Sequence, residues 1–505
     1  MNQQAIMGRS DTQKVSNRHV ARLGLIVFLA SWLSAGWYHQ SRDWNVASRL
    51  MLVYSLGDRW SVSLDGFQRQ TGDLAFKDGH YYCDKAPGFS LLATPAYIVG
   101  KFLFRWPNHP TNQDGFAYWP ADAWVTWLSS GLASAMISWM IFQWLVSFQI
   151  SPRNASICAI TILWASPLAV YSTLAYGHQV ASALLMGAAL IAITKIRAGA
   201  SQKWPALVGL LAGFGVLTEL AQAPVAIAIG LVILATDFHF RAILQNATAM
   251  ILGAMPSALI LITYNFIAFG APLDMGYFHH ATQQFAKVHS AENPLGLNAP
   301  DLSRLMPLFF GEYRGLLFYA PWVALAPVGW YKMVSQKKWA FLTIALSGFL
   351  VPLWVNLSYP EWTGGWSTGP RLLVPALPWL GLASGYAIGS GSNRIRWIAI
   401  PCQIWGWLIA TGFNGVGGRI SQDTLRPVRD ALWPLWSGAR LPRFWPGERF
   451  ARTVPAELAN HFFGFNLSDG RLWILLLCVV QVLCVVCILL VTRYKPLNKA
   501  ETPPE

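Results

Sequence analysis

The chain has 505 residues, of which 54% are hydrophobic and 12% are charged, whereas soluble domains contain roughly 25% charged residues. This composition excludes an ordinary soluble protein and predicts an all-α protein that crosses a membrane many times. The net charge of +14 is explained by basic cytoplasmic loops that meet anionic membrane lipid. No basic run with interleaved aromatic residues occurs, so no nucleic-acid partner is expected.

The apolar segments predict about twelve membrane-spanning helices, because roughly 20 apolar residues are needed to cross a bilayer. The candidate spans are residues 22–38, 121–146, 154–174, 180–195, 204–218, 222–236, 246–268, 315–331, 339–356, 371–389, 396–413 and 471–492. Between and beside them lie tails of residues 1–21 and 493–505 and long loops of residues 39–120, 269–314 and 414–470.

Basic residues predict the orientation of these spans. Both tails are basic, so both should be cytoplasmic, which requires an even number of spans. The short loops 195–203, 331–338 and 392–396 are also basic, and they are cytoplasmic only if the apolar segment 89–105 does not cross. We therefore predict that residues 89–105 form a helix at the outer surface. The outer loop 414–470 carries seven arginines, against this orientation, but the rule is weak for long loops.

This orientation places the unusual polar residues on the noncytoplasmic face. The first outer loop contains Asp43, Asp65, Asp73 and the adjacent pair Asp84–Lys85. Acidic residues in Asp-Gly turns are often only turn formers, which is the alternative for Asp65. Further candidates on this face are His178, Glu219, Arg314, Trp362, Trp366 and Arg371.

Two of these candidates have specific alternatives, and a third is harder to explain as purely structural. His178 lies at a hairpin tip and could serve only to cap a helix. Arg371 could anchor the start of a span whose N-cap is Thr368, but a helix start beside two glycines and an arginine also suits an anion, which we favour. Glu219 lies in a short turn between apolar helices, where a carboxylate is costly unless it is paired or wet.

Several motifs resemble membrane glycosyltransferases of the C fold, such as protein O-mannosyltransferases and lipid A aminoarabinose transferases. The chain reads YYCDKAPGFSLLATPAY at residues 81–97, where Lys85-Ala86-Pro87-Gly88 takes the place of the family's KPP-type motif before a juxtamembrane helix. The segment GGWSTGPRLLVPALPWL at 364–380 resembles a GPR…PALP signature of this family. The segments at 268–277 and 311–322 also resemble segments of the family. The resemblance covers most of the chain in topology, and residues 22–413 form the expected transmembrane glycosyltransferase-like core.

One departure concerns the catalytic base. The family has an Asp-Glu pair after the first span, and its Asp is the expected base. Here the matching region reads HQSRDWNVASR, where Asn45 stands near Asp43. The candidates for the base are therefore Asp84 first, then Asp73, Asp65 and Asp43.

The resemblance implies inverting transfer of a sugar from a polyprenyl-phosphate donor to a protein, lipid or glycan acceptor. The reaction would take place at the noncytoplasmic face of a bacterial inner membrane. A carboxylate would accept the proton of the acceptor hydroxyl, and cations would neutralise the departing phosphate. No cofactor is expected. Some relatives use a divalent metal, but no ligand spacing here requires one. The expected substrate-binding residues are Lys85, Arg371, Arg314, His178, Glu219, Trp362 and Trp366.

Two other functions remain open at this stage. A transporter or lipid flippase would show internal repeats and polar residues at mid-membrane, and neither pattern is convincing here. A non-catalytic assembly subunit would explain the altered acidic pair. The enzyme would be favoured if one outer cavity brought together six of these residues, which are Asp84, Lys85, His178, Glu219, Arg314 and Arg371.

Overall fold

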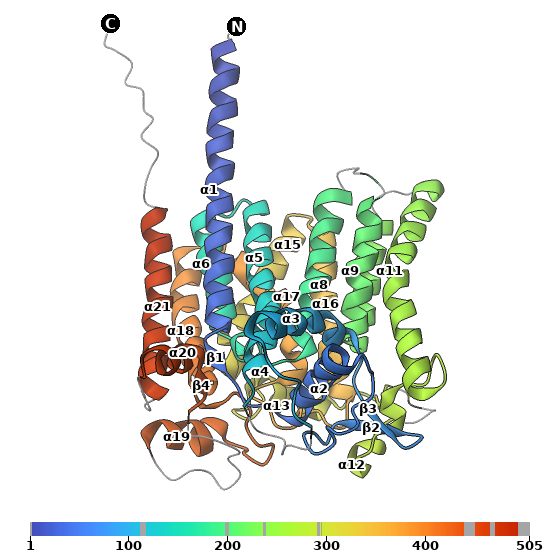
Figure 1. The fold of residues 1–505 in the computed structure, drawn as a ribbon. Coiled ribbons are helices and arrows are strands. Elements are labelled where there is room, and N and C mark those ends of the chain that lie inside the picture. The colour runs from blue at the N-terminus through green and yellow to red at the C-terminus, as the bar shows by residue number, and fades with distance from the viewer. Residues whose placement is uncertain are drawn as a thin grey trace, which may run out of the picture.

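The computed structural model describes residues 3–111, 118–196, 201, 203–235, 239–289, 293, 295–438, 450–464 and 470–492. Within these ranges the chain is mainly helical, and long helices run side by side through one bundle (Figure 1). The predicted tail 493–505 lies outside the described residues, as do parts of the loops 39–120, 269–314 and 414–470.

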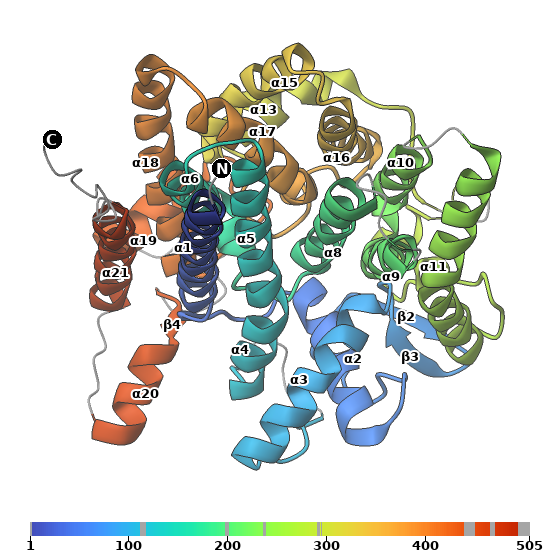
Figure 2. The ribbon, with the colours of Figure 1, turned by 90° about the horizontal axis from the view of Figure 1, so that it is seen from above.

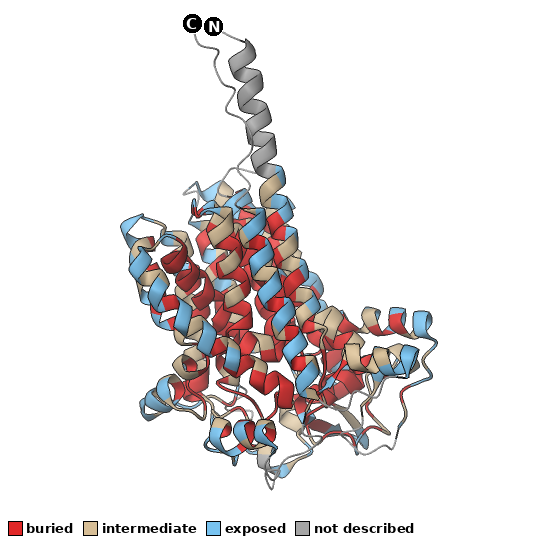
Figure 3. Ribbon diagram, turned by 90° about the vertical axis from the view of Figure 1, so that its left-hand side faces the viewer, coloured by how far each residue is buried: buried red, intermediate tan, exposed pale blue. Residues whose placement is uncertain are grey.

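The helices that form the bundle follow the apolar segments of the sequence. They are α1 (Gln3–Ala35), α5 (Leu132–Ser147), α6 (Pro152–Trp164), α8 (Gly177–Ile191), α9 (Lys203–Thr218), α10 (Ala223–Leu234), α11 (Phe240–Phe269), α15 (Ala326–Ser335), α16 (Trp339–Ser358), α17 (Leu377–Gly389), α18 (Asn393–Val416) and α21 (Gly470–Val491). Their buried side chains fill the interior of the bundle (Figure 3).

Six helices among the described residues are long and apolar enough to cross a membrane by length and composition. They are Pro120–Ser147, Gly177–Ile196, Phe240–Phe269, Trp339–Ser358, Arg371–Gly389 and Gly470–Val491. The predicted number of about twelve spans is therefore not confirmed. Shorter apolar helices occupy Gly88–Phe104, Lys203–Thr218 and Leu220–Leu234.

Three predicted segments differ in their helical limits. Helix α1 begins at Gln3, so most of the predicted tail 1–21 is helical, since a helix once nucleated propagates at little cost. The predicted span 154–174 is interrupted after Trp164, because Ser166 caps a new short helix with its hydroxyl. The predicted span 315–331 is broken around Pro321, as proline disfavours helical geometry in the residue before it.

Short elements connect the bundle helices. The short α-helices are α2 (Trp44–Arg59), α3 (Gly88–Phe104), α4 (Pro120–Thr126), α7 (Pro167–Tyr171), α12 (Gln283–Ala286), α13 (Leu305–Phe310), α14 (Leu316–Tyr319), α19 (Trp433–Ser437) and α20 (Val454–Phe463). Single turns of 3₁₀ or π type are η1 (Trp127–Gly131), η2 (Ala192–Ile196), η3 (Leu220–Gln222), η4 (Gly276–His279), η5 (Leu302–Arg304), η6 (Pro321–Leu325), η7 (Arg371–Ala376) and η8 (Val428–Leu432).

Two small antiparallel sheets complete the fold. Strands β2 (Leu74–Lys77) and β3 (His80–Cys83) form a hairpin in which Leu74 pairs with Cys83. Strand β1 (Tyr38–His39) pairs with β4 (Arg452–Thr453) and so joins the end of α1 to a distant part of the chain. All six cysteines are free.

Helix α3 lies across the direction of the bundle helices (Figures 1 and 2). Its start packs tightly on the end of α9, because an added Cβ at Gly88 would lie only 2.6 Å from the backbone of Leu217 and Thr218. Its far end exposes Phe102, Leu103 and Phe104. This direction suits a helix at a membrane surface, although its place relative to a membrane stays a prediction.

The two ends of the bundle differ in character. Helix α1 starts and α21 ends at the same end (Figure 1). Helices α2, α12 and α13 and the β2–β3 hairpin lie at the opposite end. The polar cluster described below belongs to this second end.

Replacing Gly88 with alanine is expected to destabilise the protein by about 1–3 kcal/mol, because the new methyl group overpacks the backbone of α9. Thermal unfolding of the purified protein in detergent measures this change. Gly187→Ala is the matched control, since an added Cβ there would lie 3.6 Å from its nearest neighbour, the Leu211 side chain. Equal stability of the two variants would contradict the tight contact between α3 and α9.

Candidate functional site

Lys85 lies between two buried carboxylates at the junction of β3 and α3. Its ammonium contacts Asp84 Oδ2 and lies 3.0 Å from Asp73 Oδ2. The Asp84 side chain is 0% exposed, whereas that of Asp73 is 11% exposed. Burial alone would raise the pKa of Asp84, but Lys85 and His280 hold that pKa well below its usual range. Asp84 is therefore held ionised, and Asp73 is the second carboxylate that contacts Lys85.

His280 fixes the buried Asp84 from the other side. Its Nε2 lies 3.2 Å from Asp84 Oδ2, and the Thr282 amide donates to its Nδ1 at 3.2 Å. Because Nδ1 accepts a hydrogen bond, Nε2 carries the ring proton in this geometry and donates a hydrogen bond to Asp84. The Ser48 hydroxyl donates to Asp84 Oδ1 at 3.3 Å. Asp84 thus has three side-chain partners.

The loop after α11 brings His280 to this position. His280 forms an isolated bridge with Ala75 of β2, and the Ala281 amide donates to the Leu74 carbonyl at 2.7 Å. An added Cβ at Gly276 would lie 2.9 Å from the Asp84 Cα. Glycine therefore allows the loop to approach the backbone beside the Asp84–Lys85 pair.

Asp73, Asp84 and His280 could also hold a metal ion. Their ligand atoms all lie within 4.8 Å of one another, and all three side chains are buried. Two carboxylates and an imidazole are an acceptable donor set for a divalent metal. Lys85, however, contacts both carboxylates, so a metal would have to compete with its ammonium.

A second charged centre joins α2, α8 and the turn before η3. Arg49 Nη2 lies 3.1 Å from Glu219 Oε1, and Arg49 Nη1 also donates to Asn45. His178 Nδ1 lies 3.3 Å from the same Glu219 oxygen, at ion-pair distance but without hydrogen-bond geometry. Gly177 stands where a Cβ would collide with Glu219. The costly carboxylate predicted in this turn is therefore paired.

Arg371 belongs to a third centre, beside Tyr176 and Asp43. The Arg371 guanidinium lies over the Tyr176 ring, 4.5 Å from its centroid, and donates to the Gly364 carbonyl at 2.8 Å. The Tyr176 hydroxyl donates to Asp43, whose other oxygen accepts the Val46 amide at the start of α2. Arg371 Nε is buried without a hydrogen-bond partner among the described residues.

The three centres lie close enough to interact electrostatically. Burial raises the pKa of the Tyr277 phenol, and that pKa is also shifted by the charges of Lys85, Glu219, Asp84 and Arg49. Burial likewise raises the pKa of Tyr359, and the charges of Lys85, Arg371 and Asp84 also shift it. Most of the predicted site residues therefore converge at one end of the bundle.

Other predicted residues have different surroundings. Arg314 is buried, and its guanidinium donates to the carbonyls of Thr363, Gly365 and Ser367 at 2.7–2.8 Å. This geometry favours holding the 363–367 loop over binding phosphate. Trp362 and Trp366 in this loop are partly buried.

Two further expectations concern local structure. Asp65 accepts from the Tyr81 amide at 2.8 Å and lies 2.7 Å from His80, away from the three centres. Thr368 does not cap the segment that starts at Arg371; its hydroxyl donates to the Gly418 carbonyl at 2.9 Å. The predicted N-cap role of Thr368 is therefore wrong.

The sequence reasoning missed Arg49, His280 and a further buried ion pair. Arg42 Nε lies 3.2 Å from Asp122 Oδ2, and the Tyr54 hydroxyl also donates to Asp122. Asp122 lies at the start of a predicted span, where an ionised carboxylate requires a partner. That requirement was the available signal for this pair.

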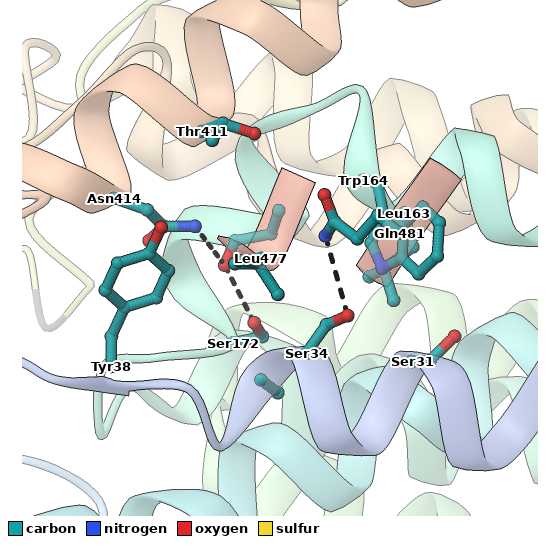
Figure 4. Close-up of a pocket in the computed structure, with 12 residues that line it drawn as sticks. Ser31, Ser34, Tyr38, Leu163, Trp164, Ser172, Thr411, Asn414, Leu477 and Gln481 are labelled. Atoms are coloured by element: carbon teal, nitrogen blue, oxygen red, sulfur yellow. Dashed lines mark hydrogen bonds between the residues drawn. The ribbon is translucent and has the colours of Figure 1, made fainter. Parts of the chain in front are cut away.

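A small polar pocket lies outside this cluster, between α1, α6, α18 and α21 (Figure 4). Gln481 of α21 donates to Ser34 of α1 at 3.5 Å, and Asn414 donates to the Ala169 carbonyl at 3.2 Å. The pocket contains no ionised side chain. Its hydrogen bonds connect helices and do not contribute to the charged cluster.

Comparison with solved structures shows where this fold occurs. The chain is similar to ArnT from Cupriavidus metallidurans bound to undecaprenyl phosphate, with a TM-score of 0.52 and 15% identity over 94% of this chain and 72% of that chain. ArnT in the apo state gives a TM-score of 0.49 and 14% identity over 95% and 73% of the two chains. No protein-family model matches the chain, and no curated protein matches it significantly.

A more distant similarity links the chain to AglB, the oligosaccharyltransferase from Archaeoglobus fulgidus, in complex with an inhibitory peptide and a dolichol-phosphate. The TM-score is 0.40 and the identity 11%, over 77% of this chain and 55% of that chain. ArnT is a lipid A aminoarabinose transferase with the C fold of glycosyltransferases. The predicted resemblance to this class is thus confirmed for the fold, and the candidate spans agree with an integral membrane protein.

Glu219 is expected to make the stability of the protein depend on acidic pH. Burial raises its pKa, but His178, Arg49 and Arg371 lower it more, to about 2 from an ordinary value of 4.5. Because the folded pKa is depressed, the contribution is present above pH 4.5 and is lost as the pH falls towards 2. It amounts to at most about 3 kcal/mol.

Thermal unfolding as a function of pH measures this loss. The wild type should lose stability more steeply over that interval than Glu219→Gln. Asp78→Asn, in the exposed turn of the β2–β3 hairpin, removes an equivalent charge and serves as the control. Parallel curves for the wild type and Glu219→Gln would show that Glu219 is not held ionised by its partners.

Proposed function

We propose that this chain transfers a sugar from a polyprenyl-phosphate donor to a protein, lipid or glycan acceptor. The observation that carries the proposal is the convergence of Lys85, Arg49 and Arg371 with buried carboxylates at one end of an ArnT-like bundle. A polyprenyl phosphate offers one anionic group on a long apolar tail. Such a ligand suits a charged centre beside membrane helices.

Lys85 and Arg371 are the proposed phosphate contacts. Lys85 approaches from the start of α3, whose exposed apolar end would border the path of the lipid tail. Arg371 has a buried Nε without a partner among the described residues, so one donor is available for a ligand oxygen. Preorganised cations of this kind stabilise the charge that develops on the departing phosphate.

Asp73 is the carboxylate best placed to serve as the base. It lies within electrostatic range of Arg371 as well as beside Lys85. Its side chain is 11% exposed, whereas that of Asp84 is 0% exposed, and Lys85 is its one side-chain partner among the described residues. Asp84, the first choice from sequence, is fully enclosed by three partners and is assigned here to hold Lys85. Asp43 is engaged by Tyr176 and the α2 amide.

The proposed reaction takes place at the noncytoplasmic face and inverts the sugar configuration. Asp73 would accept the proton of the acceptor hydroxyl while the oxygen attacks the sugar carbon, and the bond from that carbon to the lipid phosphate breaks. The basic short loops support this orientation. The positive charge between Asp73 and Asp84 is assigned to Lys85, so the proposal does not require a metal.

Replacing Asp73 with asparagine should lower the rate of transfer by roughly 10²–10⁴-fold, because the general base is lost. Mass spectrometry of a deletion strain that carries each variant measures the rate through accumulation of the lipid-linked sugar and loss of the modified acceptor. Asp84→Asn should reduce transfer less and should lower thermal stability, since Lys85 loses a buried partner. Chelation by EDTA should leave the wild-type rate in isolated membranes unchanged.

The same experiment separates the alternatives. An active Asp73→Asn with an inactive but folded Asp84→Asn would move the base to Asp84. Full transfer in strains that carry asparagine variants at Asp73, Asp84 and Asp43 would show that none of these carboxylates is the base and would favour an assembly subunit. Loss of activity with EDTA would assign the Asp73, Asp84 and His280 set to a metal.

Arg371→Ala should weaken binding of undecaprenyl phosphate by roughly 10- to 100-fold, because hydrogen bonds to charged groups contribute about 1.5–3 kcal/mol. Fluorescence titration of the purified protein with this carrier measures the affinity. Arg426→Ala removes an exposed arginine and is the control. Equal affinity of the wild type and Arg371→Ala would remove Arg371 from the phosphate site.

A further inference from the structure

Helix α20 presents its apolar side chains away from the protein. Leu458, Phe462 and Phe463 are 51%, 69% and 72% exposed, and no residue of the helix is buried. At 100° per residue, all of its apolar residues fall on one broad face and Glu457, Asn460 and His461 fall on the other. The helix is therefore amphipathic, and Leu458 and Phe462 on its apolar face are largely exposed.

On the polar face of α20, Glu457 contacts the protein, whereas Asn460 and His461 are exposed. Glu457 lies 2.9 Å from His39 Nδ1, and the other ring nitrogen of His39 contacts the Trp119 carbonyl at 3.1 Å. The helix start is fixed as well, because Thr453 pairs with Tyr38 and accepts the Ala456 amide at 3.4 Å. These contacts hold the apolar face outward, so its exposure is not the result of a loosely attached helix.

The direction of α20 indicates what covers this face. Both α20 and α3 lie across the bundle and extend from the same side of it (Figure 2). Helix α3 exposes Phe102 and Leu103 in the same way. Helix α21, the next helix in the chain, is a candidate span with only 22% of its apolar window buried. The exposed face of α20 thus lies near a surface that membrane lipid would cover.

We propose that α20 is a second membrane-surface helix, with Leu458 and Phe462 inserted among the lipid acyl chains near the headgroups. Amphipathic helices lie in the membrane plane in this manner, with the apolar face turned toward the lipid. Glu457 and His39 fix its depth relative to the bundle. This inference concerns the lipid surface and does not depend on the sugar-transfer proposal.

Depth-dependent fluorescence quenching in liposomes tests the assignment on the full chain. An environment-sensitive fluorescent amino acid replaces Phe462 in one sample and Asn460, on the polar face, in a matched control. Lipids brominated near the glycerol end of the acyl chain should quench the probe at Phe462 at least twofold more than the probe at Asn460. Iodide in the aqueous phase should show the opposite order.

Two results would overturn the proposal. Equal iodide quenching at both positions would show that the apolar face stays in water. Protection of Phe462 that disappears when the protein is diluted in excess lipid would show that a second copy covers the face. Glu457→Gln provides a further check, because loosening the His39 contact should reduce bromolipid quenching at Phe462 while the thermal unfolding temperature of the bundle stays within a few degrees.

Discussion

The structure depends on the pairing of ionised groups that are buried at one end of an apolar bundle. An unpaired charge in such surroundings is strongly unfavourable, and breaking a buried pair costs about 3–5 kcal/mol. Arg49 with Glu219 and Lys85 with two aspartates meet this requirement. The Arg49–Glu219 pair joins segments 170 residues apart in the sequence. The charged cluster therefore also fixes how α2, α3 and the neighbouring bundle helices meet.

Close backbone approach is the second condition for this cluster. Gly88 lets the start of α3 rest on the end of α9, which places Lys85 near the turn that holds Glu219. Gly276 lets the loop after α11 reach the backbone beside Asp84. An added Cβ at either position would lie less than 3.0 Å from neighbouring backbone, so the elements would have to move apart. The polar contacts and the small residues thus depend on each other.

The sequence was informative where the governing property is local. Runs of apolar residues predict the bundle helices, and the adjacent Asp84–Lys85 pair was recognised because its members are neighbours. Hydropathy could not reveal the interruptions near Ser166 and Pro321, since capping and proline act within an otherwise apolar run. The number of crossings therefore stays unconfirmed.

Residue roles that depend on distant contacts were harder to predict. Arg49 was missed because its partner Glu219 lies 170 residues away. Arg314 looked like an anion contact, but only the structure shows that nearby carbonyl groups engage its guanidinium. Glu219 was identified as needing a partner, although its partner was not. Burial of a charge can be anticipated from sequence, whereas the group that neutralises it is set by the tertiary fold.

The position of Lys85 between Asp73 and Asp84 has a consequence for the timing of charge in the proposed reaction. When Asp73 takes up a proton it becomes neutral, and its attraction for the ammonium falls. At the same moment the departing lipid phosphate gains a second negative charge. The electrostatic preference of one lysine thus shifts from the base to the leaving group as the sugar moves, with no change in the total charge of the site. Proton transfer and departure of the phosphate would be coupled through a single side chain.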